Sequence, residues 1–222
     1  MKTSTKHFGV PTAVALFMLS SPCSAQIGIG VDNPAAETSQ NERKEGRDAG
    51  EATSRPKKVQ EAVDMLTKKY GEPNLIGDDV AMWMNSGPFL YTMVWSEEVK
   101  HNFPMAHTDF VQQGVRYDVP TDKLTDLAEY DGSVYVDRTK GVLSARCDKE
   151  EMNLLALNLA NDIITGKKTV KDARAYYAKA AMMFMKGEKD PYTQKLQFTP
   201  KASSGFPDEP FDMKEMGEMK PK

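Results

Sequence analysis

The chain has 222 residues, of which 40% are hydrophobic and 27% charged, and its formal net charge is −3. This length and composition are typical of one globular domain with an apolar core. Lys and Arg do not gather in a basic cluster, and zinc-finger and helix-turn-helix signatures are missing, which argues against a nucleic-acid-binding protein.

The first 25 residues have the layout of a secretory signal peptide. A start with two lysines precedes a mostly apolar run over residues 10–19, and the small residues Cys23 and Ala25 stand just before Gln26. We therefore expect cleavage before Gln26 and export to the periplasm or the extracellular space. Lipidation of Cys23 is the alternative. Later segments lack the run of about 20 apolar residues that a membrane span needs, so we expect no transmembrane segment in the mature chain.

Residues 26–56 differ in composition from the segment that follows. They are rich in Glu, Arg, Asn, Ser and Gly and poor in aromatic residues. Such a segment buries too little apolar surface to offset its ordering entropy, so we expect a disordered linker. Residues 57–70 then place apolar side chains at helical spacing on one face, which predicts the first helix.

Two alternating runs, residues 80–84 and 89–95, flank a turn and predict a β-hairpin. A third alternating run over residues 111–119 predicts another strand, and a short helix is expected behind it. The first hairpin carries four aromatic side chains: Trp83, Phe89, Tyr91 and Trp95. Such side chains usually form the core face of a sheet, but they would line a ligand groove wherever helices leave the sheet uncovered.

The middle of the chain predicts a second hairpin followed by a buried helix. Residues 134–136 and 142–147 alternate like two strands around a short turn. The helix behind them is apolar around most of its circumference, so we expect it to be the most buried one. Asp148 is its predicted N-cap, Glu151 stands at capping-box spacing, and Gly166 marks its end.

The last predicted helix begins at Thr169, with Asp172 three residues on, and ends near Gly187. Residues 189–222 are dominated by Pro, Lys, Asp, Glu and Gly and predict a mostly disordered, charged tail that contains methionines. The order of elements predicts a single α+β domain over residues 57–188. Its mostly antiparallel sheet would combine two hairpins with a further strand, covered by about four helices.

Histidine is scarce in the mature chain. Its two histidines are His101 and His107, with Met105 between them and Asp109 just beyond, in a segment expected to be a loop interrupted by Pro104. Imidazole with thioether suits copper, and imidazole with carboxylate suits zinc. His101, Met105 and His107 are therefore candidate metal ligands, and metal affinity should fall below about pH 6.5. The alternative is an ordinary surface connection.

Methionines recur in two other places. Three of them stand at a spacing of three in the tail: Met213, Met216 and Met219. Thioethers at this spacing resemble the methionine motifs that hold Cu(I) in exported copper proteins; the alternative is a low-complexity tail without a ligand. Met182, Met183 and Met185 point in different directions on the last predicted helix, which favours a packing role for them.

Cys147 is the only cysteine left once a signal peptide is removed, which excludes an internal disulfide. We expect a buried core thiol, because a nucleophile needs a histidine base and the sequence places none beside it. The nucleophile elbow, the His-Glu-Xaa-Xaa-His motif, the P-loop and the dinucleotide fingerprint do not occur.

These observations favour an exported, non-enzymatic binding or interaction module for an unknown protein or small-molecule partner. We expect no cofactor and no nucleic acid. The alternative is a periplasmic metal-handling protein, with copper ahead of zinc.

Overall fold

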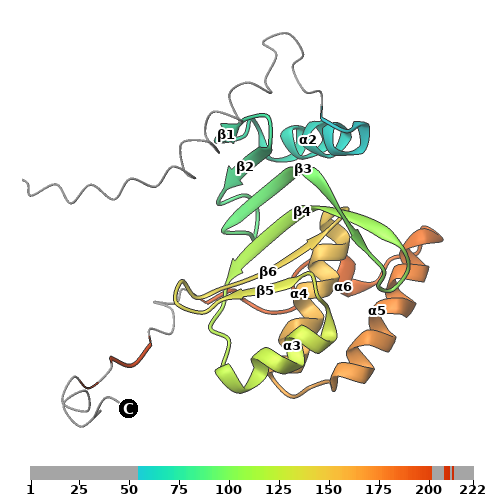
Figure 1. Ribbon diagram of the computed structural model, residues 1–222. Coiled ribbons are helices and arrows are strands. Elements are labelled where there is room, and N and C mark those ends of the chain that lie inside the picture. The colour runs from blue at the N-terminus through green and yellow to red at the C-terminus, as the bar shows by residue number, and fades with distance from the viewer. Residues whose placement is uncertain (1–54, 202–207, 211, 213–222) are drawn as a thin grey trace, which may run out of the picture. The chain divides into compact units, whose positions relative to one another are not determined.

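An antiparallel sheet organises the part of the chain that the computed structural model describes, residues 55–201, 208–210 and 212 (Figure 1). Its order is β1-β2-β3-β4-β6-β5, and every neighbouring pair is antiparallel. The strands are β1 (Leu75–Ile76), β2 (Val80–Met84), β3 (Tyr91–His101), β4 (His107–Arg116), β5 (Val134–Asp137) and β6 (Val142–Cys147). The predicted signal peptide, nearly all of the predicted linker, and Met213, Met216 and Met219 lie outside the described residues.

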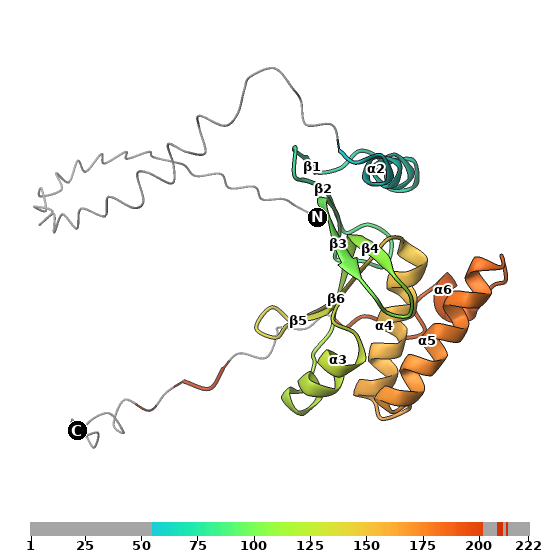
Figure 2. The same cartoon turned by 45° about the vertical axis from the view of Figure 1, so that its right-hand side comes forward.

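The helices that the structure describes lie on one side of this sheet (Figure 2). They are α2 (Lys57–Tyr70), the 3-10 helix η1 (Thr121–Lys123), α3 (Leu124–Tyr130), α4 (Glu150–Ile164), α5 (Val170–Met185) and α6 (Pro191–Gln194). The α+β class with an antiparallel sheet is therefore confirmed. Within the described part of the chain, no helix has the length and apolar character to cross a membrane.

Two apolar clusters fill the space between the sheet and its helices. One joins α2 to β2, β3 and β4, and Val59 and Trp83 are buried in it. The other surrounds α4 and takes in β6, α3 and α5. Of the 15 residues of α4, eleven are buried, and Leu155 and Leu157 are fully buried. The prediction that this helix is the most buried one is confirmed, because a helix that is apolar all round needs neighbours on every side.

The two predicted helix starts have different outcomes. Thr169 caps α5, and its hydroxyl accepts a hydrogen bond from the Asp172 backbone N–H at 3.1 Å. Asp148 is not the N-cap of α4, because the helix begins one residue later and Lys149 takes the cap position without a capping side chain. The Asp148 carboxylate instead accepts from the Cys147 thiol at 3.6 Å and pairs with the Lys149 ammonium at 3.0 Å.

The long hairpin of β3 and β4 differs most from its prediction. The expected loop from His101 to His107 is in fact a short connection, because β3 runs on to His101 and β4 begins at His107, its direct cross-strand partner. A register shift between Val94 and Val99 interrupts the alternation of β3. An irregularity of this kind hides the period-two signal that would reveal the end of a strand.

The residues after α5 return to α4. The Asn158 side-chain amide donates to the carbonyls of Tyr192 and Lys195, each at 2.9 Å, and its carbonyl oxygen accepts from Gln197 N–H at 2.7 Å. A buried asparagine whose donors and acceptor are all used fixes the backbone it contacts. This part of the predicted tail is therefore held against the core helix.

Candidate metal centre

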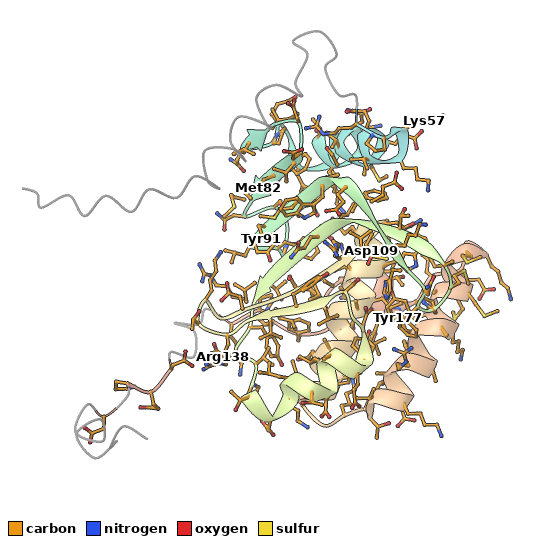
Figure 3. All side chains as sticks on the ribbon, viewed as in Figure 1. Lys57, Met82, Tyr91, Asp109, Arg138 and Tyr177 are labelled. Carbon is orange, nitrogen blue, oxygen red and sulfur yellow. The ribbon has the colours of Figure 1, made fainter. Side chains whose placement is uncertain are left out.

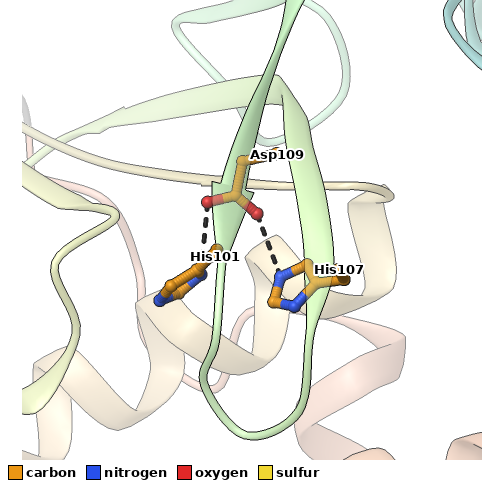
Figure 4. A group of neighbouring side chains, drawn as sticks. All are labelled: His101, His107 and Asp109. Atoms are coloured by element: carbon orange, nitrogen blue, oxygen red, sulfur yellow. Dashed lines mark ion pairs between the residues drawn. The ribbon is translucent and has the colours of Figure 1, made fainter.

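The closed end of the β3–β4 hairpin, next to the short connection between the two strands, brings three potential metal ligands together (Figure 4). His101 and His107 are cross-strand partners, and their ring centroids are 4.9 Å apart. Asp109 lies two residues along β4 from His107 and therefore points to the same face. Its carboxylate lies between the imidazoles, with Oδ2 3.2 Å from His101 Nδ1 and Oδ1 3.0 Å from His107 Nε2.

Burial gives this arrangement its chemical character. Asp109 is 0% exposed, and the imidazole side chains of His101 and His107 are each 17% exposed. The Ser133 hydroxyl donates to Asp109 Oδ2. His101 Nδ1 is buried without a directed hydrogen bond, and Asp109 Oδ1 lacks one as well whenever His107 Nε2, 3.0 Å away, carries no proton. Leaving a buried polar atom without a hydrogen bond costs about 1–3 kcal/mol, and a metal ion would satisfy both atoms at once.

The outer contacts of the two imidazoles define which nitrogen faces the centre. His107 Nδ1 lies 2.8 Å from the Met105 carbonyl oxygen, which can only accept, so Nδ1 carries a proton and Nε2 is left for a ligand. His101 Nε2 lies 3.5 Å from Asp131 Oδ1, which leaves Nδ1 turned towards Asp109. Metal-binding histidines commonly hold a carbonyl or a carboxylate on the nitrogen that does not bind the metal.

The charged and polar neighbours of the centre determine whether His107 is protonated when no metal is bound. The neighbouring Asp109 carboxylate raises the pKa of His107 to about 11; the Cys147 and Met105 contacts add to this, and burial opposes it. For the nearby Asp131 carboxyl, burial is the main cause of a raised pKa. His107 is therefore an imidazolium at neutral pH, and a metal must displace its proton. The expected fall in affinity below about pH 6.5 used the ordinary pKa of histidine, and the raised pKa of His107 moves that expected fall to higher pH.

Cys147 lies beside the same imidazole. Its Sγ is 3.4 Å from His107 Nε2 and 4.0 Å from the Tyr177 hydroxyl. The expected burial of the thiol is confirmed at 4% exposure, and burial raises its pKa. The sequence alone places no histidine beside Cys147, and the structure brings His107 there from β4, the neighbour of β6 in the sheet.

This arrangement differs from a cysteine–histidine–aspartate triad. In a triad, the nucleophile and the carboxylate contact opposite nitrogens of the imidazole. Here Cys147 Sγ and Asp109 Oδ1 both approach His107 Nε2, and Nδ1 faces a backbone carbonyl. Donors that converge on one point suit the binding of an ion better than the relay of a proton.

A pocket of about 170 Å³ opens next to the centre. Its lining comes from the β3–β4 connection, the β6–α4 junction, α4 and α5, and consists of Pro104, Met105, His107, Cys147, Asp148, Lys149, Met152, Tyr177, Ala181, Phe184 and Met185. The Met105 thioether belongs to this pocket and is not one of the three converging ligands. The structure thus brings His101 and His107 together as the sequence predicts, and puts Asp109 in the place expected for Met105.

The four aromatic candidates for a ligand groove do not meet in one place. Trp83 and Phe89 are each 2% exposed and belong to the two different apolar clusters. Tyr91 and Trp95 are half-buried on the sheet face turned away from the helices, and Tyr91 begins β3, at the opposite end from His101 (Figure 3). Phe89 precedes the first residue of β3, so the alternation that placed it beside Tyr91 does not extend to it.

No family model, curated protein or solved structure matches the chain. The chemistry of the site therefore follows from its own donors. Asp109 was recognised from the sequence as a donor of this segment but was not chosen as a candidate ligand, and Cys147 was not considered as a ligand at all. Period-two spacing from His107 would have identified Asp109 once the strand was extended to that residue. The contact of Cys147 with His107 depends on strand order, for which the local sequence carries no signal.

Proposed function

We propose that the protein binds a divalent transition metal through His101, His107 and Asp109, and that it handles this metal after export from the cytoplasm. The observation that supports the proposal most is the convergence of one donor atom each from His101, His107 and Asp109, which all lie within 4.8 Å of one another, together with the buried His101 Nδ1 that lacks a directed hydrogen bond. Native proteins rarely bury polar atoms in this state without a further partner.

The donor set favours Zn(II) or Cu(II). Two imidazoles and a carboxylate are ligands that both ions accept. Three protein ligands leave a fourth position on a tetrahedral ion, where the Cys147 thiolate or a water molecule would complete the shell. With neutral imidazoles the three ligands carry one negative charge, so a divalent ion is only partly neutralised and its binding releases the His107 proton to solvent.

Calorimetry of the purified mature chain with Zn(II) and Cu(II) at neutral pH tests the proposal. The double variant H101A/H107A should lose the binding heat and keep the helical circular dichroism, because the core lies around α4. N102A is the matched control, since Asn102 is exposed in the same connection and outside the cluster. A wild-type protein without binding heat, or a double variant that retains it, would refute the proposal.

A further inference from the structure

We propose that the pocket beside the centre captures a soft monovalent metal ion, Cu(I), through the thioethers of Met105, Met152 and Met185. The inference deepens the proposed function, on which it rests for the inner end of the route at His107. Three methionines, one cysteine and one histidine line this single pocket. They come from distant parts of the chain: the β3–β4 connection, α4, α5, β6 and β4.

The chemistry of the lining separates soft ions from hard ones. Thioether and thiolate ligands select Cu(I), whereas a divalent zinc ion gains little from a neutral thioether. The pocket also contains the ammonium group of Lys149, which would repel a cation. The Asp148 carboxylate lies 3.0 Å from that ammonium and offsets its charge.

The exposure of the sulfur-containing residues of the lining falls from solvent to core. Met185 is 67% exposed and Met105 43%, whereas Met152 is 7% and Cys147 4% exposed. The exposure of Met185 places it at the rim and not in the core, within the core or rim packing expected for the methionines of this helix. The lining therefore combines two exposed methionines, where an ion would enter, with a buried thiol whose Sγ is 3.4 Å from His107 Nε2.

Transfer along this path requires no redox partner. The ion enters and remains as Cu(I), held first by neutral thioethers. At the base a Cu–S bond forms to Cys147 as its S–H bond breaks, and the proton leaves to solvent. The same thiol lies next to the divalent centre, so Cys147 and His107 are shared between the pocket and that centre.

Competition with the chelator bicinchoninate under anaerobic conditions measures the Cu(I) affinity, and Ag(I) serves as a probe that does not change its oxidation state. The test variant is M105L/M152L/M185L, in which leucine keeps the apolar volume and removes the sulfur. All proteins carry M213L/M216L/M219L, so that the tail contributes no thioether. M65L/M84L is the control, because Met65 and Met84 are exposed methionines outside this pocket.

The test variant should bind Cu(I) and Ag(I) about tenfold or more weakly, the scale on which losing a supporting group acts at metal sites. The control should bind like the parent protein, and zinc heats should be unchanged in both. Unaltered Cu(I) and Ag(I) affinity in the test variant would overturn the inference, and so would an equal loss in the control. If zinc binding is missing while thioether-dependent Cu(I) binding persists, the divalent proposal fails and the capture site stands.

Discussion

Replacing Asp109 by asparagine should abolish stabilisation by metal while keeping the size of the side chain. The carboxylate is fully buried between two imidazoles and accepts from Ser133. Without it, the pKa of His107 should fall from about 11 towards its ordinary value, because its main cause is removed. Removing one partner of a buried ion pair costs about 3–5 kcal/mol. We expect about 3 kcal/mol here, because the imidazole can lose its charge.

The metal-dependent part of this prediction is the more specific one. At a free zinc concentration of about 100 times Kd, a ligand that binds only the folded state stabilises it by about 2.7 kcal/mol. For a domain of this size each kcal/mol shifts Tm by about 2–4 °C, so zinc should raise the wild-type Tm by roughly 5–11 °C. Asp109→Asn should show no such rise.

Thermal unfolding followed by circular dichroism, with and without zinc after treatment with a chelator, measures both parts. Asp122→Asn is the control, because Asp122 is exposed and outside the cluster. If Asp109→Asn gains as much stability from zinc as the wild type does, the ion binds elsewhere and the proposed centre is wrong.

Three further predictions concern the core, the titration of the centre and export. Leu155→Ala should lower the free energy of unfolding by about 2–5 kcal/mol, since Leu155 is fully buried, and an unchanged denaturant midpoint would contradict this. The raised pKa of His107, about 11, stabilises the metal-free fold fully below about pH 6.5 and less as pH rises towards 11. The stability difference between wild type and His107→Gln should therefore shrink with rising pH, while the zinc affinity of the wild type grows. If the stability difference and the zinc affinity instead rose or fell together, the result would count against the centre. N-terminal sequencing of protein from the cell envelope should begin at Gln26, and an intact Met1 there would rule out the predicted cleavage.

The local periodicity of the sequence was sufficient to predict several helices and strands but not the ends of others. The second hairpin, α4 and the Thr169 cap were predictable, because each depends on a pattern within a few residues. Asp148 carries the residue type of a cap and yet bonds to the Cys147 thiol, since the helix begins one residue further on. Strand ends near His101 were hidden by the irregular register of β3.

The candidate site was predictable only in part for a related reason. The two histidines were found because they are scarce and close in sequence. Asp109 required the correct strand boundary, and the pairing of β4 with β6 joins strands that are not consecutive in the chain. Cys147 therefore reaches His107 through tertiary topology, which spacing along the sequence does not encode.

The contacts within and beside the His101–His107–Asp109 cluster join residues that are far apart in the sequence, and this has a consequence for the order of folding. The contact from Ser133 to Asp109 spans 24 residues, that from Cys147 to His107 spans 40, and that from Cys147 to Tyr177 spans 30. Non-local contacts form late, because closing the chain between them costs entropy before they contribute stability. A chain threaded through a membrane in the unfolded state would thus cross it before these contacts form, and the proposed metal centre would be assembled only where folding is completed.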